Sequence, residues 1–189
     1  LPEIGKELNA RLNINELLSI VLRRSVETLG AISGYILIIN PGGAPLKKSY
    51  SASDIEMAFP NLDGFLENIE ETRQGLIISD TRKDERWQAG QINLLHSAVI
   101  VPMFGRNTLL GLLVLAHENE DYFESEHLLL SQAIADQAAI ALENARLYAD
   151  VAKEQQRLSA VLHSAANAIL MFDADDCLRL LNPAGEKLF

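Results

Sequence analysis

The feature that most constrains the fold is a long helical pattern in the second half of the chain. No proline or glycine occurs from Ser125 to Ala166, and apolar residues recur there at helical spacing. At about 1.5 Å per residue, such a helix is on the order of 60 Å long. We expect Ser125 to be its N-cap and Glu126 to lie favourably at the positive end of its dipole. A helix of this length cannot bury all its faces against one small sheet.

Two sets of residues on this helix suit two different contacts, one with the sheet and one with a second copy of the helix. Small and apolar residues in its first half suit packing on a sheet, namely Leu129, Ile134, Ala138, Ala141 and Leu142. A second set repeats at alternating spacings of four and three and predicts the seam of a homodimeric coiled coil, formed by Ile140, Asn144, Leu147, Val151, Glu154, Leu158 and Val161. Fewer than four clean heptads are present, so a helix that packs only on its own domain remains the alternative.

Short elements precede the long helix. Helical periodicity predicts a first helix over 14–29, which Gly30 ends, and a second over 62–72. Apolar runs predict strands over 34–39, 45–51, 75–80, 97–104 and 109–116, with turn residues after the first and fourth. Pro102 lies inside a predicted strand and indicates an edge or a bulge. A charged loop from Arg82 leads to Trp87, the only tryptophan.

The last residues predict a small hairpin and the start of a helix. Strands are expected over 168–173 and 177–182, and Pro183 is a favourable first helical residue. We expect Cys177 to be a buried strand residue. Two short strands cannot bury a core of their own, so the sequence predicts a further domain of a longer protein here.

The order of elements resembles a GAF domain, a small sensory module. The segments that carry the resemblance are SAVIVPM at 97–103, LGLLVL at 110–115, YFESE at 122–126 and LSQAIADQAAIALENA at 130–145. The tail resembles the start of a PAS domain, through Phe172-Asp173 and Asn182-Pro183-Ala184. The expected fold is α+β, with a central antiparallel sheet, helices on its faces and a long C-terminal helix that leads into a partial PAS hairpin. The expected domains are a helical linker (1–13), the GAF domain (14–148), a signalling helix (149–166) and the truncated PAS start (167–189).

This resemblance implies a non-catalytic sensory and dimerisation module of a bacterial signalling protein, most often a sensor histidine kinase of a two-component system. The downstream signalling domains would lie in the same chain. The alternative is a small-molecule receptor domain of a cyclic-dinucleotide enzyme, a phosphatase or a transcription regulator.

Composition and motifs exclude several functions. The net charge of −10 argues against binding of nucleic acid by this segment. The single cysteine excludes a disulfide framework and suits a reducing cytoplasm, and anchoring of the parent protein in a membrane outside this segment is left open. Because no cysteine lies in the GAF segment, covalent attachment of a bilin is not expected there. The four histidines lack metal-ligand spacing, so we expect His96, His117 and His163 to be ordinary surface residues, with haem ligation by one histidine left open.

The GAF resemblance places a small-molecule pocket between the sheet and the covering segment 54–87. Its candidate residues are Tyr35, Tyr50, Phe59, Phe65, Arg82, Arg86, Trp87 and Ser97. The two arginines would hold an anionic ligand by paired hydrogen bonds. The alternative is that the aromatic residues fill the core and the charged run is a solvated loop. The sequence does not name a ligand or a cofactor.

Overall fold

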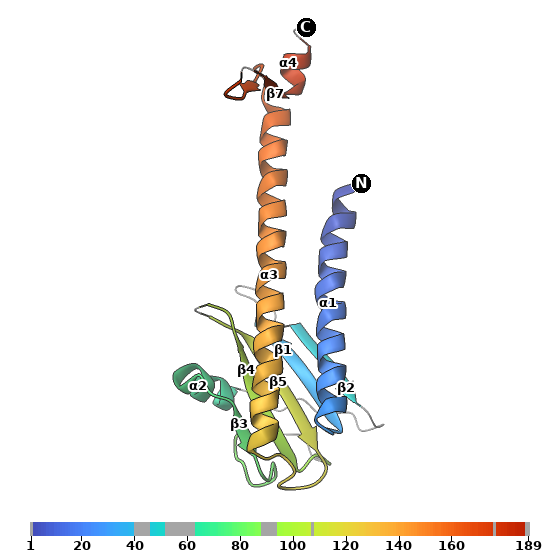
Figure 1. Ribbon diagram of the computed structural model, residues 1–189, viewed down its shortest axis with the longest axis vertical. Helices are drawn as coiled ribbons and strands as arrows, with labels where there is room; N and C mark the ends of the chain where they lie inside the picture. The colour runs from blue at the N-terminus through green and yellow to red at the C-terminus, as the bar shows by residue number, and fades with distance from the viewer. Residues whose placement is uncertain are drawn as a thin grey trace. The chain divides into compact units, whose positions relative to one another are not determined.

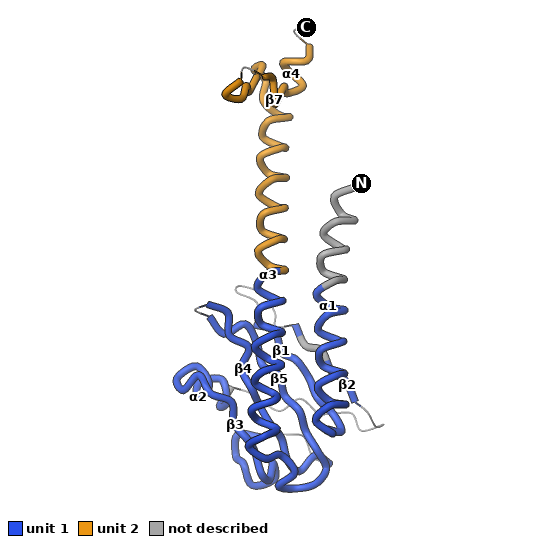
Figure 2. The backbone as a smooth tube through the Cα atoms, in the orientation of Figure 1, with its two compact units in different colours: residues 1–144 blue, residues 145–189 orange. Residues whose placement is uncertain are grey.

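The computed structural model describes residues 2–39, 46–51, 63–87, 94–106, 108–175 and 177–187. Its elements are α1 (Pro2–Thr28), β1 (Ser33–Ile38), β2 (Leu46–Ser51), α2 (Asp63–Thr72), β3 (Leu76–Ile78), β4 (Ser97–Phe104), β5 (Leu109–His117), α3 (Ser125–Ser164), β6 (Leu170–Phe172), β7 (Leu178–Leu181) and α4 (Pro183–Glu186) (Figure 1). The chain divides into two units, residues 1–144 and residues 145–189, and α3 contributes to both (Figure 2).

The first unit is built on a five-stranded antiparallel sheet with the order β2-β1-β5-β4-β3. Pro102 lies in β4, which has a neighbouring strand on each side. However, β3 pairs with β4 only as far as Ile100, and the β4–β5 register shifts between Met103 and Phe104. Pro102 therefore lies beyond the last β3 pair and next to an irregularity, as expected for a residue without an N–H.

The sheet is covered on both faces, which explains its nearly continuous apolar strands. On one face, Ile36, Val99 and Leu113 pack in a core cluster with α1 and the first half of α3. On the other face, alternate strand residues such as Tyr35 and Ile100 pack with α2. Because successive strand side chains point to opposite faces, both sets are buried. The predicted α+β fold with helices on the faces of an antiparallel sheet is confirmed.

Helix α1 ends as predicted and begins earlier than predicted. Gly30 follows it with φ +63°, and the Ala31 N–H donates to the Val26 carbonyl at 3.0 Å, the long hydrogen bond of a Schellman motif. At the other end the helix begins at Pro2, so it includes the residues expected as a separate helical linker.

The start of α3 differs by one residue from the prediction. Ser125 is its first helical residue, and Glu124 occupies the cap position because its carbonyl accepts from the Leu128 N–H at 3.1 Å. The Glu124 N–H in turn donates to His127 Nδ1 at 3.1 Å, which is one of the two bonds of a capping box. Leu129, expected to pack on the sheet, is 72% exposed. The face of α3 that packs is instead formed by Ser131, Ala135, Ala138, Ala139 and Leu142.

The second unit contains the end of α3, the predicted hairpin and a short helix. Strands β6 and β7 pair antiparallel, and Asn182 caps α4 with Pro183 in its first turn. Cys177 is exposed, contrary to the prediction, because it lies in the turn before β7, where its N–H donates to the Asp173 carboxylate at 2.9 Å. None of the helices in the described ranges has the length and apolar character needed to cross a membrane.

Candidate functional site

Three of the predicted pocket residues come together on the α2 face of the sheet. Tyr35 of β1 and Phe65 of α2 are fully buried, and Trp87 is 5% exposed. The Phe65 and Trp87 rings meet edge to face, with centroids 6.4 Å apart. The Arg86 guanidinium lies over the face of the Phe65 ring, 4.7 Å from its centre. The described part of this face is thus a packed aromatic core.

The indole of Trp87 is the least satisfied group in this core. Its Nε1–H is buried and has no hydrogen-bond acceptor in the part of the chain that the structure describes. A buried donor without an acceptor costs roughly 1–3 kcal/mol. Trp87 is therefore a predicted pocket residue whose buried donor lacks an acceptor among the described residues.

The remaining uncharged candidates lie elsewhere. The partly buried Tyr50 packs against the core cluster of α1 and α3, on the opposite face from Tyr35. Ser97 has the same strand parity as Val99, which also packs in that cluster, and its Oγ donates to the Asn119 carbonyl at 2.7 Å. Phe59 lies outside the described residues. The pocket residues predicted from the sequence therefore come from both faces of the sheet.

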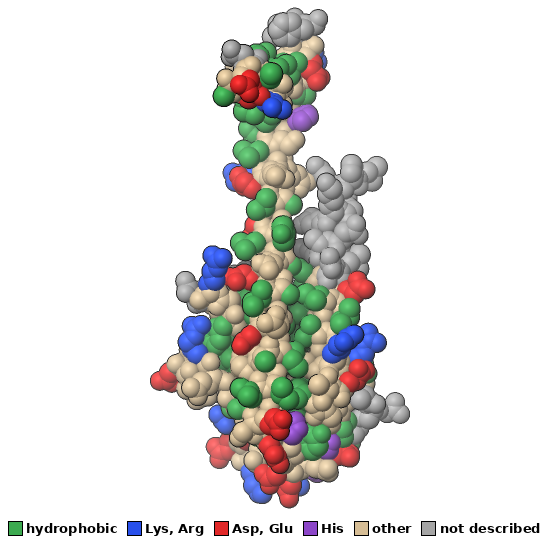
Figure 3. Space-filling model, in the orientation of Figure 1, with side chains coloured by type: hydrophobic (Ala, Val, Ile, Leu, Met, Phe, Trp, Pro, Cys, Tyr) green, Lys and Arg blue, Asp and Glu red, His purple; other side chains and the backbone are tan. Residues whose placement is uncertain are grey.

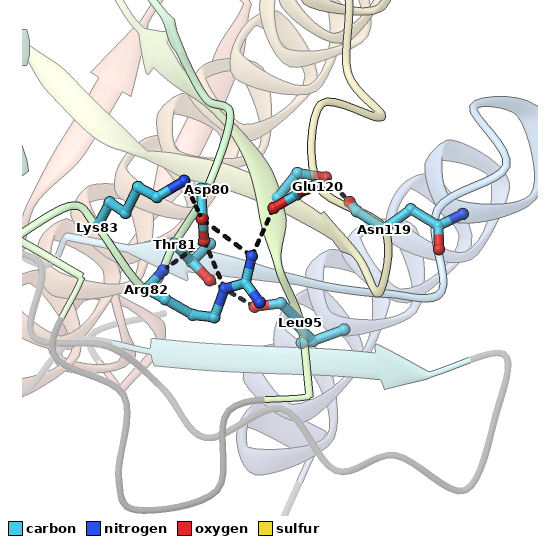
Figure 4. Close-up of polar contacts among 8 residues, drawn as sticks. Asp80, Thr81, Arg82, Lys83, Leu95, Asn119 and Glu120 are labelled. Carbon is cyan, nitrogen blue, oxygen red and sulfur yellow. Dashed lines mark hydrogen bonds and ion pairs between the residues drawn. The ribbon is translucent and has the colours of Figure 1, made fainter.

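Both predicted anion-binding arginines already hold carboxylates of their own loop. Arg82 Nε and Nη2 donate to the two Asp80 oxygens at 2.7 and 2.9 Å (Figure 4). Arg86 makes the same pair of bonds to Asp84 at 2.9 and 2.7 Å. In each case the aspartate also accepts the arginine backbone N–H, at 3.0 Å. The expectation that these guanidinium groups close on a ligand stays a prediction, and the Nε–Nη2 edge of each is occupied by an aspartate of the same loop.

The ion pairs at Asp80 connect two loops of the first unit. Arg82 also pairs with Glu120, which follows β5, and Lys83 pairs with Asp80 at 2.9 Å (Figure 4). The hydrogen bonds from Arg82 and Lys83 hold the pKa of the Asp80 carboxyl well below its usual range. We name this set, Asp80, Arg82, Lys83 and Glu120, the loop clamp. It was not predicted, although the repeated Asp-x-Arg spacing of 80–82 and 84–86 is visible in the sequence.

His117 belongs to a second cluster that the sequence did not indicate. Its ring stacks on Tyr122 with centroids 3.6 Å apart, and its Nδ1 accepts from the Asn119 N–H at 3.0 Å. Burial lowers the pKa of His117, and the Glu118 carboxylate acts in the opposite direction. Tyr122 donates its hydroxyl to the Leu29 carbonyl at the end of α1, at 3.2 Å. His117 is thus a buried neutral residue, and its prediction as a surface residue was wrong.

The predicted seam residues lie exposed on α3. Ile140, Leu147, Val151, Leu158 and Val161 are 51–59% exposed, and hydrophobic side chains are visible along the length of α3 in Figure 3. Asn144 and Glu154 are exposed as well. A free apolar stripe of this kind is available to a partner.

The described residues do not assemble a metal centre. No group of three or more histidine, cysteine, aspartate or glutamate side chains that could hold a metal ion occurs within them. His96 is partly buried, and His163 is an exposed helix residue whose Nδ1 lies 2.8 Å from the Ser159 carbonyl oxygen.

Solved structures of GAF domains have the same fold as this chain. The GAF domain region of a putative membrane protein from Geobacter sulfurreducens matches with a TM-score of 0.60 at 15% identity and covers 73% of this chain and 98% of that chain. The GAF domain of a phosphoenolpyruvate-protein phosphotransferase from Coxiella burnetii matches with a TM-score of 0.56 at 19% identity and covers 79% of this chain and 94% of that chain. At these identities the likeness shows the fold.

Two curated relatives and one family model match most of this chain. The formate hydrogenlyase transcriptional activator of Escherichia coli (strain K12) is 27% identical over 158 residues, which are 82% of this chain and 22% of that protein. The activator of the same name from Salmonella typhimurium (strain LT2) matches to the same extent. The chain thus spans about a fifth of the length of these relatives. The GAF domain model matches residues 11–143, more than half of the chain, and the chain therefore belongs to the GAF domain family.

Proposed function

We propose that this GAF domain is a non-catalytic sensory module that forms a homodimer along α3 and relays a signal through that helix to domains that follow. The observation that carries the proposal is the exposed apolar stripe at Ile140, Leu147, Val151, Leu158 and Val161. These residues recur at the spacing of a coiled coil, and α3 runs unbroken through all of them.

The spacing of the stripe continues toward the start of α3. Leu130, Ala133 and Gln137 precede Ile140 at steps of three, four and three, and all are exposed. The seam thus has the length of more than four heptads when these positions are included. This extension supports a dimer over the alternative of a helix that packs only on its own domain.

The energy of the seam suits a switch. Complete burial of a Val, Leu or Ile side chain contributes roughly 1.5–3 kcal/mol, and these five are already about half buried. Each therefore has about 1 kcal/mol to gain, or about 10 kcal/mol for the two copies. Association costs roughly 4–15 kcal/mol in lost freedom. The margin is small, so a signal of a few kcal/mol is enough to shift the packing of the seam.

The output of the parent protein is the part of the proposal that rests on relatives. These relatives are named as transcriptional activators, which favours a transcription regulator. A sensor histidine kinase remains the other candidate, and it rests on the resemblance of the tail to a PAS start. The β6–β7 hairpin and the Asn182 cap have the order that this resemblance requires.

Native mass spectrometry of this chain, purified from its natural host, tests the proposal. We expect twice the mass of one chain when the spray concentration is raised to roughly a hundred micromolar, and dissociation on dilution, because the margin is small. A mass of one chain at that raised concentration would refute the dimer and, with it, the relay through a helix seam.

The second candidate is a receptor for a small molecule that binds on the α2 face. The observation that favours it is Trp87, whose buried indole N–H has no acceptor among the described residues. A ligand with a carbonyl, carboxylate or phosphate oxygen supplies such an acceptor.

The single tryptophan makes this candidate testable by fluorescence. Trp87 emission and the melting temperature are measured across a panel of metabolites, with Trp87→Phe as the control. A ligand at this site shifts the Trp87 emission and the melting temperature of the unmodified chain, and it shifts the melting temperature of Trp87→Phe less. If no compound moves either signal, the receptor reading loses its support.

A further inference from the structure

The Asn182 side chain occupies the junction between the end of α3 and the elements that follow. The residue is 2% exposed. Its Oδ1 accepts from the backbone N–H groups of Ile169 and Gly185 at 2.8 and 3.0 Å. Its Nδ2 donates to the carbonyls of Leu162 and Asn167 at 3.2 and 3.0 Å. A carboxamide has two donor hydrogens and two principal acceptor positions, so its hydrogen-bonding capacity is filled.

These four bonds cap two helices at once. Leu162 lies in the last turn of α3, where carbonyls have no partner within the helix. Gly185 lies in α4, for which Asn182 is the N-cap in an extended conformation. The other two bonds hold the segment that connects α3 to β6. One buried side chain therefore joins the end of one helix to the start of the next and to the connection between them.

No other side chain of similar size reproduces this set of bonds. Aspartate keeps the acceptors for Ile169 and Gly185 but has no donor for the two carbonyls when ionised. Serine offers one donor hydrogen, and alanine offers none. The junction therefore requires both halves of the carboxamide.

We infer that Asn182 is a positioning residue that makes the end of α3 a rigid joint, so that a displacement of the helix is passed to β6, β7 and α4 instead of being absorbed by a hinge. The existence of the joint is independent of the proposed function, and its meaning as a relay rests on that function. A hinge at this place would dissipate a change of twist or register in α3.

Distances between two spin labels within one chain test the joint. The labels are placed at Lys153→Cys on α3 and Met171→Cys on β6, both exposed, in a Cys177→Ser background that removes the only native thiol. Labelled chains are diluted with unlabelled chains, so that only distances within a chain are measured. We expect a single narrow distribution with Asn182 and at least a twofold greater width in Asn182→Asp, which keeps the cap of α4 and loses both carbonyl contacts.

Amide hydrogen exchange shows that the variant retains its local fold. In Asn182→Asp the amides of Ile169 and Gly185 keep their protection, whereas in Asn182→Ala their exchange accelerates on the order of tenfold. If the β6 and β7 amides exchange freely in Asn182→Asp, the distance comparison is made with Asn182→Ser, for which an increased width is also expected. Equal widths with asparagine and with the folded variant would overturn the inference.

The dimer is measured separately by light scattering on the same unlabelled chains. A monomer with a narrow distribution refutes the proposed seam and supports the joint. A dimer in which the label-to-label distance is distributed as narrowly in the folded Asn182 variant as in the chain with Asn182 supports the seam and refutes the joint.

Discussion

Replacement of Leu147 and Val151 by aspartate is the sharpest test of the seam. The two side chains are 51% and 57% exposed in the single chain, so the area that the dimer removes from water is about half of each. At about 1 kcal/mol per half-buried side chain, four side chains in the two copies account for roughly 4 kcal/mol. This loss corresponds to about a thousandfold weaker dimer, before the cost of placing carboxylates at the seam is added.

The measurement is the mass of Leu147→Asp/Val151→Asp by light scattering and sedimentation equilibrium over a range of protein concentrations. Helix content is followed by circular dichroism, because aspartate has a lower helix propensity than leucine. The matched control is Ala149→Asp/Ala152→Asp, which adds the same two charges at exposed positions of α3 outside the stripe. Alanine is the best helix former, so the control perturbs the helix at least as much as the test variant does.

The two variants distinguish an interface formed by the stripe from a general effect of helix stability or net charge on association. We expect the seam variant to have the mass of one chain and the control to stay dimeric at the same concentration. A seam variant that remains dimeric refutes the placement of the interface. Equal dissociation of both variants means that helix stability or net charge, rather than the stripe, controls association.

Three further predictions concern the first unit. Burial lowers the pKa of His117, so the contribution of this residue to stability is present above its pKa in the unfolded chain, about 6.5, and is lost as pH falls. From pH 7 to pH 5, the melting temperature of His117→Phe should therefore decrease less than that of the unmodified chain. The hydrogen bond from Arg82 is the main cause of the lowered pKa of Asp80, so the contribution of Asp80 to stability is present above about pH 4 and is lost as pH falls below it. The difference in melting temperature between the unmodified chain and Asp80→Asn should therefore shrink toward pH 3. Gly30→Ala places a side chain at positive φ against the Tyr122 hydroxyl and should cost at least about 1–2 kcal/mol in urea denaturation, whereas Gly64→Ala in α2 should be neutral or stabilise by up to about 1 kcal/mol.

Local sequence patterns predicted the elements well because their signals are local. The β4 prediction, 97–104, has the observed bounds, since an apolar run ends there at Gly105 and a turn. The end of α1 was predicted because Gly30 adopts the positive φ that a Schellman motif needs. The extension of α1 to Pro2 was missed because the N-terminal residues lack a clear apolar stripe.

The candidate site was predicted less well because it depends on strand register and on contacts between distant loops. Tyr50 pairs with Gly34, while Tyr35 pairs with Ser49, so the two tyrosines point to opposite faces. A shift of one residue in register would have reversed this result, and the sequence does not fix the register. The stacking of His117 on Tyr122 depends on the path of the loop between β5 and α3, which periodicity does not describe.

The contacts just before α3 connect this helix to the loops of the sheet and to α1. The Asp121 N–H, just before α3, donates to the Ser79 carbonyl at 2.8 Å, and the neighbouring Glu120 pairs with Arg82 of the loop clamp. Tyr122 holds the end of α1 through the Leu29 carbonyl. The same loop that carries Arg82 leads to Trp87 on the α2 face. The segment just before α3 is thus held to the loop that leads to Trp87 by one ion pair and to β3's end by one backbone hydrogen bond. Under the proposed relay, a displacement of this loop therefore acts first at the start of α3, the helix that carries the exposed stripe.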